Sequence, residues 1–117
     1  MVDRSDLAIA EILDEITWLD GIAKGRTFAD FVEDRTLRYA VERSIEIISE
    51  ASRRLSPEAK ALCPEVPWRS VGGIGNILRH EYHATAPRIV WEVVTRDLTG
   101  LKAAMAVIAA HGPETDD

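Results

Sequence analysis

The stretch PWRSVGGIGNILRHEYHATAP, residues 67–87, decides how the rest of this chain is interpreted. Pro67 suits the first turn of a helix, because the N–H that proline lacks would have no helical partner there. Pro87, which follows Ala-Thr-Ala, marks the next break in the pattern. The spacing of the two prolines predicts a helix from about Trp68 to about Tyr82.

Two faces of this predicted helix differ in chemistry. Four polar residues at spacings i, i+3, i+4 and i+7 share one face: Asn76, Arg79, His80 and His83. Three apolar residues repeat the helical spacing on another face, which we expect to pack on the core: Val71, Ile74 and Leu78. The helix is therefore expected to carry amide, guanidinium and imidazole groups on a face of their own.

Three glycines lie inside the same predicted helix, at Gly72, Gly73 and Gly75. Each costs about 1 kcal/mol relative to alanine in a helix interior, so we expect the close approach of another backbone to offset that cost. The approaching backbone could belong to the same chain or to a second copy. We expect the second copy, in a symmetric homodimer, because pairing two such helices would bring two His80 stripes into one cleft.

The composition indicates a single folded domain at residues 1–112, followed by a polar acidic tail at 113–117. Hydrophobic residues make up 46% of the chain, which argues against disorder. No apolar run approaches the length of a membrane span, and the N-terminus lacks the pattern of a signal peptide, so we expect a cytoplasmic protein with no membrane contact. Cys63 is the only cysteine, which excludes an internal disulfide and a cysteine-based metal site.

The net charge of −6 argues against a general nucleic-acid-binding protein, but the charge is unevenly distributed. Residues 1–34 hold nine acids and three bases, a balance of −6. Residues 35–113 hold eight acids and eleven bases, a balance of +3. A polyanion would therefore be drawn to the part of the chain that contains Arg69, Arg79 and Arg88.

Apolar residues at helical spacing predict helices along the rest of the chain, and no segment shows the alternation of a strand. The first apolar stripe is expected to begin with Leu7 and Ala10. A charged row that includes Arg38, Glu42 and Glu46 is expected to face solvent.

We expect main helices at about residues 3–23, 34–55, 68–82 and 87–108, the last bent near Asp97–Gly100. A short helix at 28–33, capped by Thr27, is expected to offer Phe28 and Phe31 to the core, and Ser56 and Pro57 open another short helix. The predicted fold class is all-α: an antiparallel helical bundle of four main helices plus one or two short ones.

The motif G-N-I-L-R-H-E-Y at residues 75–82, with P-W-R before it and R-I-V-W-E-V-V-T-R-D-L at 88–98, resembles the HepT-like branch of the HEPN superfamily. The stretch D-R-T-L-R-Y-A-V-E-R-S-I-E-I-I-S-E-A at 34–51 extends this resemblance over nearly the whole chain. Such proteins are helical dimers that act as endoribonuclease toxins, and a minimal nucleotidyltransferase is their antitoxin partner. The resemblance therefore implies a HEPN-like homodimer, an RNA substrate and that partner, with no cofactor.

The family signature is R-polar-x-x-x-H, often extended to R-x-x-x-x-H-x-Y. In this chain the polar residue is Asn76 and the histidine is His80, whereas Gly75 stands at the arginine position. The resemblance implies that His80 acts on the ribose 2′-hydroxyl or the leaving oxygen, while the arginine supports charge on the phosphorane. Glycine can do neither. We expect Arg79, one helical turn beyond Gly75, to take over that role with His80, and Arg69 to be the reserve.

The resemblance also implies that the antitoxin transfers AMP to Tyr82, which would block access of RNA. We assign Arg69, His83 and Arg88 to substrate binding. The alternative is that these side chains are solvated and have no role in binding. The sequence H-E-Y-H lacks the i, i+4 spacing of a zinc motif, so we expect no metal site. The alternative function is a catalytically inactive HEPN-like subunit that associates with a nucleotidyltransferase or with nucleotides.

Overall fold

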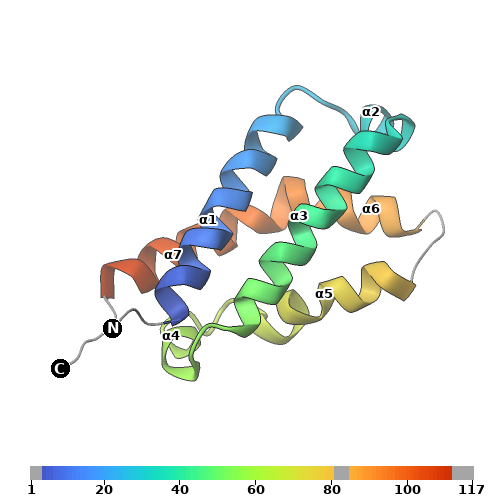
Figure 1. Ribbon diagram of the computed structural model, residues 1–117. Coiled ribbons are helices and arrows are strands. Elements are labelled where there is room, and N and C mark those ends of the chain that lie inside the picture. Colours follow the sequence, from blue (N-terminus) through green and yellow to red (C-terminus); the bar gives the residue numbers. More distant parts are fainter. Residues whose placement is uncertain (1–3, 81–84, 112–117) are drawn as a thin grey trace.

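The computed structural model describes residues 4–80 and 85–111, with side-chain surroundings for 5–75 and 87–111, and every regular element in these ranges is a helix (Figure 1). In chain order they are α1 (Arg4–Ala23), α2 (Phe28–Glu33), α3 (Arg35–Arg53), α4 (Pro57–Ala61), α5 (Trp68–His80), α6 (Thr85–Glu92), the π-helical η1 (Val93–Asp97) and α7 (Leu98–His111). The predicted all-α fold is confirmed. Its four main helical segments are α1, α3, α5 and the run α6–η1–α7, and α2 and α4 are the short helices.

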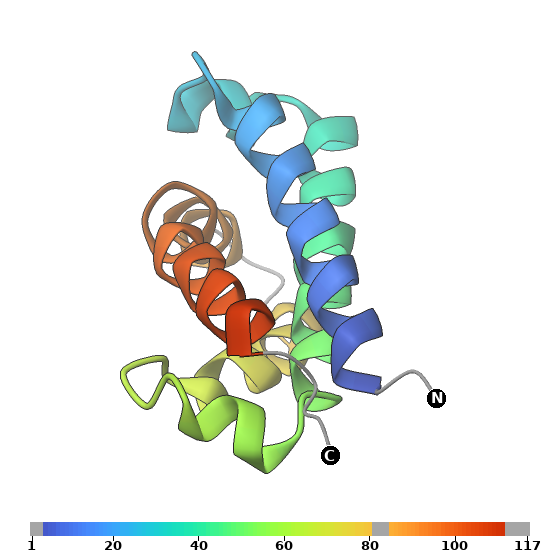
Figure 2. The ribbon, with the colours of Figure 1, turned by 90° about the vertical axis from the view of Figure 1, so that its left-hand side faces the viewer.

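The long helices form two layers around one core. Helices α1 and α3 lie side by side and run in opposite directions, while α7 packs on α1 and α5 packs on α3 (Figure 1). Figure 2, turned by 90°, shows the α6–α7 run beside the α1–α3 pair rather than between its helices. Helix α5 packs on the second half of α3, which is its largest contact with another helix.

Three helices supply the core at one spacing. Residues at i, i+4 and i+7 are buried on α1 (Ile12, Ile16, Leu19), on α3 (Val41, Ile45, Ile48) and on α7 (Leu101, Met105, Ile108). This spacing keeps side chains on one face of a helix, which is why the apolar periodicity of the sequence is diagnostic. The start of the α1 stripe was predicted wrongly: Leu7 is 64% exposed, and Ala8 and Ile9 are buried instead.

The α2 helix begins at a capping box, as the sequence predicts. The Thr27 hydroxyl accepts the Asp30 N–H at 3.1 Å, and the Asp30 carboxylate accepts the Thr27 N–H at 2.9 Å. The next helix, α3, begins at Asp34, whose carboxylate accepts the Leu37 N–H at 2.9 Å. These side chains satisfy backbone donors that have no partner inside a helix, so two successive helix starts are fixed locally.

A π-helical segment, η1, ends at Asp97, where the predicted bend at Asp97–Gly100 begins. Gly100 lies inside α7, and a Cβ added there would meet nothing within 4 Å. Val94 in η1 and Leu98 just after it are both buried, and the helical run continues into α7 without a break.

Gly72 is where α5 and α3 approach each other closely. Its carbonyl oxygen accepts hydrogen bonds from Ser49 Oγ at 2.9 Å and from Arg53 Nη1 at 2.5 Å. A Cβ built on Gly72 would lie 3.1 Å from Arg53 Cγ, whereas one built on Gly73 would meet nothing within 4 Å. Close packing within the chain therefore accounts for Gly72, and the surface at Gly73 is open.

None of the helices within the described ranges is both long enough and apolar enough to cross a membrane.

We expect Gly73→Ala to raise the free energy of unfolding of the single chain by up to about 1 kcal/mol, because alanine favours a helix and the added methyl group meets no neighbour. Gly72→Ala should gain less, because the Arg53 stem that contacts the added methyl group must shift. Urea titrations of both variants and the wild type, at a concentration where gel filtration gives one chain, measure the difference.

Equal gains for the two variants would contradict the close approach at Gly72. The same Gly73→Ala protein also tests the expected glycine seam of a homodimer. If two copies meet at Gly73, this variant should dissociate at a higher protein concentration than the wild type does.

Candidate active site

Helix α5 begins where the sequence predicts, and the indole ring of Trp68 anchors its first turn. Trp68 Nε1 donates to the carbonyl oxygens of Lys60 at 3.1 Å and Cys63 at 3.0 Å. Val71 and Ile74, further along α5, are half-buried and pack against the core. The predicted apolar face of α5 is confirmed at these two residues. The other faces of α5 are therefore left for the polar stripe.

The three predicted catalytic residues, Asn76, Arg79 and His80, lie in the last turns of α5, which is helical through His80. A regular helix places residues at i, i+3 and i+4 on one face, so their backbone positions fit the predicted stripe. The surroundings of their side chains lie outside the described residues, as do Tyr82 and His83 altogether.

Arg69 is exposed in the first turn of α5. It precedes Gly75 by six residues, which is about 9 Å along the helix axis and on a different face. Arg79 follows Gly75 by one turn and shares its face. The helix geometry therefore favours Arg79 over Arg69 as the substitute for the signature arginine within one chain.

Arg88 is exposed on α6, and its guanidinium carbon lies 4.2 Å from the centre of the Phe28 ring. The prediction that both α2 phenylalanines face the core is confirmed, since Phe31 is fully buried and the half-buried Phe28 packs against the core. The pairing of Phe28 with Arg88 joins residues 60 positions apart, and no local pattern in the sequence signals it.

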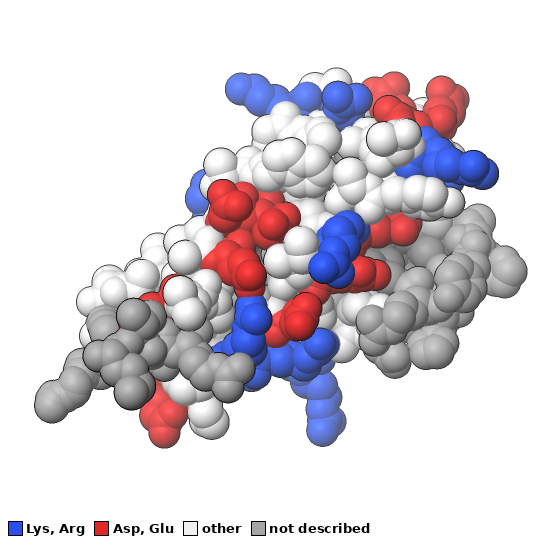
Figure 3. All heavy atoms as spheres, in the orientation of Figure 1, with Lys and Arg blue, Asp and Glu red and all other residues white. Residues whose placement is uncertain are grey.

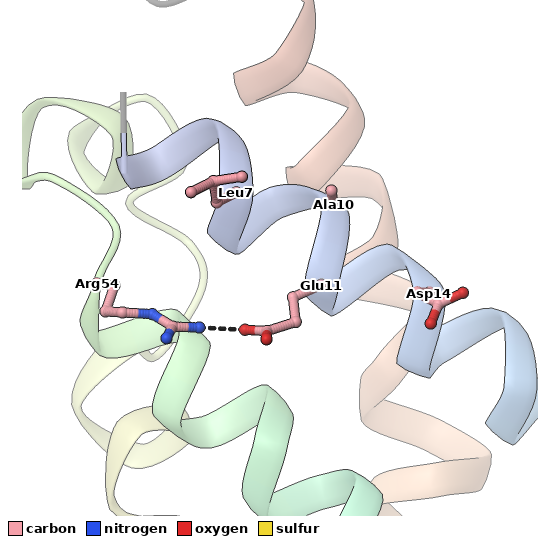
Figure 4. Close-up of a pocket in the computed structure, with 5 residues that line it drawn as sticks. All are labelled: Leu7, Ala10, Glu11, Asp14 and Arg54. Carbon is pink, nitrogen blue, oxygen red and sulfur yellow. Dashed lines mark hydrogen bonds and ion pairs between the residues drawn. The ribbon is translucent and has the colours of Figure 1, made fainter. Parts of the chain in front are cut away.

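Carboxylates cover the groove between α1 and α3. Figure 3 shows Asp and Glu side chains gathered over these helices on the face drawn in Figure 1. A groove of about 550 Å³ here is lined by Leu7, Ala10, Glu11, Asp14 and Arg54, and Figure 4 shows Glu11 paired with Arg54 across it. An acidic lining repels phosphate, so this groove is unsuited to a polyanion despite its size.

A smaller cavity of about 100 Å³ lies between α3, α5 and η1. Apolar residues make up most of its lining, among them Ile45, Ile48, Ile74 and Val93. It is too small and too apolar for a nucleotide, so the polar stripe remains the candidate reaction centre.

Neither a metal cluster nor a reactive thiol appears in the part of the chain that the structure describes. No group of three or more His, Cys, Asp or Glu side chains in this part is placed to hold a metal ion. Burial and, to a lesser extent, the Glu65 carboxylate raise the pKa of the Cys63 thiol, which is 1% exposed. A buried thiol of raised pKa is a poor nucleophile.

The comparison with protein families decides the assignment. A family model described as ribonuclease HepT-like matches residues 12–108, which include α5 and α6 in full. The chain belongs to the HepT-like ribonuclease family. The match agrees with the resemblance carried by residues 75–82 and extends over the helices that hold them in place.

Three curated relatives align with this chain over most of its length and over most of their own. A candidate RNase of Caldanaerobacter subterraneus is 37% identical over 94 residues, which are 80% of this chain and 84% of the relative. A probable ribonuclease HepT of Thermococcus cleftensis is 33% identical over 94 residues, 80% of this chain and 86% of the relative. A candidate RNase of Methanocaldococcus jannaschii is 31% identical over 98 residues, which are 84% of this chain and 90% of the relative. No solved structure matches the chain significantly.

One acid of this HepT-like chain departs from the predicted solvated row on α3. Glu42 is half-buried, and its burial raises the pKa of the carboxyl above the ordinary value of 4.5. The Arg38 guanidinium opposes that shift and the Glu46 carboxylate adds to it. Removal from water is the largest of the three effects, so folding favours the protonated form of Glu42.

We therefore expect Glu42→Gln to stabilise the protein at pH 7. Because the folded-state pKa is the higher one, the stability that protonated Glu42 contributes is complete below pH 4.5 and is lost as the pH rises through the raised pKa. Glutamine removes this loss, so the advantage of the variant should shrink towards pH 4. Urea titrations at pH 4 and pH 7 measure it.

The matched control is Glu50→Gln, at an exposed position of the same helix, which removes the same charge. A Glu42→Gln protein that is less stable than the wild type at pH 7 would mean that attraction to Arg38 outweighs the cost of burial.

Proposed function

We propose that this protein is a metal-independent endoribonuclease that acts in the cytoplasm as the toxin of a toxin–antitoxin pair. The observation that carries the proposal is the match to the HepT-like ribonuclease family over residues 12–108, which includes the helix bearing Asn76, Arg79 and His80. The names of the relatives point to the same activity.

In this mechanism His80 removes the proton of a ribose 2′-hydroxyl as the 2′ oxygen attacks the adjacent phosphorus. The bond to the 5′ oxygen of the next nucleotide breaks and that oxygen takes up a proton from water, which leaves a 2′,3′-cyclic phosphate and a 5′-hydroxyl. Arg79 stabilises the negative charge that builds on the phosphoryl oxygens, and Asn76 holds the phosphate by hydrogen bonds. His83, Arg69 and Arg88 contribute to binding of the RNA.

Two copies of the chain act together in the proposal. Pairing over the open surface at Gly73 would place two stripes with His80 at one cleft, so that RNA contacts both copies. The antitoxin is a minimal nucleotidyltransferase that adds AMP to Tyr82, and the added phosphate repels the RNA backbone.

A second candidate function rests on Gly75. If no other side chain replaces the signature arginine, the protein is a binding subunit that associates with a nucleotidyltransferase or with nucleotides and leaves RNA intact.

We expect the purified protein to cleave labelled RNA in the presence of EDTA and to leave 2′,3′-cyclic phosphate ends. His80→Ala should lower the rate by about 10²- to 10⁴-fold, the range for loss of a general base. Arg79→Ala should lower it by about 10²- to 10³-fold, the range for loss of one transition-state donor. Arg69→Ala should have a smaller effect because of its distance from Gly75.

Loss of activity only with His80→Ala would discard the role of Arg79. An intact RNA after incubation with the wild type, together with normal growth of a bacterial host that expresses it, would favour the binding subunit.

Incubation with the minimal nucleotidyltransferase antitoxin and ATP should add the mass of one AMP to the protein and stop RNA cleavage. Mass spectrometry of the digested protein should place the added group on Tyr82. The Tyr82→Phe variant is the control, because it retains the ring but lacks the acceptor oxygen. A nucleotidyltransferase that silences Tyr82→Phe as well as the wild type would rule out this regulation.

A further inference from the structure

Helices α2 and α6 meet through two aromatic contacts at matching spacings. Phe31 stacks on Trp91, with 5.3 Å between ring centres and 30° between ring planes. Three residues earlier on each helix, Arg88 lies over the ring of Phe28 at 4.2 Å. Because i and i+3 share a helix face, both contacts belong to one parallel α2–α6 seam.

The inner contact of this seam fixes the outer one. Phe31 is fully buried, and stacked rings attract beyond the area they bury, so the position of α2 against α6 is set in the core. The capping box at Thr27 starts α2 one residue before Phe28 and so determines where that ring lies. The ring of Phe28 is therefore held in a fixed position beneath the Arg88 side chain.

Arg88 carries its charge next to an aromatic ring. A guanidinium over an aromatic face gains about 0.5–1 kcal/mol at an exposed site, while its N–H groups stay at the edge of the plane. Within the described ranges, no carboxylate forms an ion pair with Arg88. A guanidinium that no described acid neutralises is suited to forked hydrogen bonding with a phosphate.

The seam also lies near the end of the candidate catalytic helix. Helix α5 ends at His80 and α6 begins at Thr85. Five residue steps span no more than about 19 Å, roughly three nucleotides of RNA backbone. In Figure 1 the end of α5 and the start of α6 lie at the same end of the molecule.

We propose that Phe28 is a positioning residue that holds the Arg88 guanidinium over its ring for a backbone phosphate of the RNA, next to the nucleotide cleaved at α5. The inference rests on the proposed ribonuclease function and gives it a defined phosphate contact. Arg88 touches the substrate in this account, and Phe28 acts only through Arg88.

The experiment compares four single variants of the full chain and one double variant, Arg88→Gln with Phe28→Leu. Arg88→Gln removes the charge, Phe28→Leu removes the ring but keeps an apolar side chain, and Phe28→Tyr keeps the ring. Arg96→Gln is the matched control, because Arg96 is exposed on the same helical run and the substitution removes the same positive charge. Circular dichroism and thermal unfolding confirm that each variant folds.

Two readouts are measured over a range of salt concentrations. The first is cleavage of RNA, separated into kcat and KM. The second is binding of a 2′-O-methyl RNA, which cannot be cleaved through its 2′ oxygen, by fluorescence anisotropy. Arg88→Gln should raise KM and Kd about tenfold, the effect of one charge-assisted hydrogen-bonding contact, and reduce the salt slope by about one.

Phe28→Leu should raise KM and Kd about two- to fivefold, consistent with the loss of one exposed cation–π contact. Phe28→Tyr, which keeps the ring, should have the KM and Kd of the wild type. In the Arg88→Gln background, Phe28→Leu should add no further loss. The kcat should change little in each case, since neither residue takes part in the chemical step.

Equal behaviour of Arg88→Gln and Arg96→Gln would overturn the phosphate contact. A further loss from Phe28→Leu in the Arg88→Gln background would overturn the positioning role. If the wild type binds the 2′-O-methyl RNA but does not cleave RNA, the ribonuclease proposal fails, and the binding data still decide the role of Arg88. If the wild type does not bind the RNA, both proposals fail.

Discussion

The contact between α3 and α5 at Gly72 is the constraint on which the candidate site depends. Ser49 and Arg53 both donate to the Gly72 carbonyl, which is possible because no side chain on Gly72 keeps the helices apart. Ser49 is 1% exposed, so its hydroxyl would be costly to leave without a partner. This polar contact fixes the depth of α5 against the core, and the apolar contacts of Val71 and Ile74 fix its rotation. The depth and the rotation of α5 together determine where its last turns lie.

The two halves of the molecule have different electrostatic roles. Two acids of α1, Glu11 and Asp14, line a groove of about 550 Å³ and disfavour the binding of an anion there. The positive balance lies in residues 35–113, which include α5 and α6. A net charge of −6 is thus compatible with RNA as a substrate, because association depends on the local field rather than on the sum.

Much of the architecture could be predicted from local rules. Apolar residues at i, i+4 and i+7 predict the core stripes of α1, α3 and α7, and Thr27, Ser56 and Pro67 mark helix starts. The phase of the first turn of α1 was missed, because Leu7 and Ala8 both suit a buried face and only the packing of α1 on its neighbours decides between them. The π-helical segment was not predicted, because the apolar residues around it keep the spacing of an α-helix.

The candidate site was predictable only in part. The stripe of Asn76, Arg79 and His80 follows from spacing along one helix, which a sequence displays directly. The contact of Phe28 with Arg88 joins two helices 60 residues apart, so it required the fold to become visible. The half-burial of Glu42 was likewise hidden, since a charged residue between Arg38 and Glu46 looks solvated in a linear pattern.

The burial of Cys63 has a consequence for how copies of this chain associate. Its sulfur is enclosed, with Sγ 3.8 Å from the Ala104 carbonyl oxygen, and no second cysteine exists to replace it. Oxidation cannot link two folded copies covalently, so any assembly must be reversible and obey mass action. If two copies form the proposed shared cleft, the amount of dimer rises with the square of the free chain concentration.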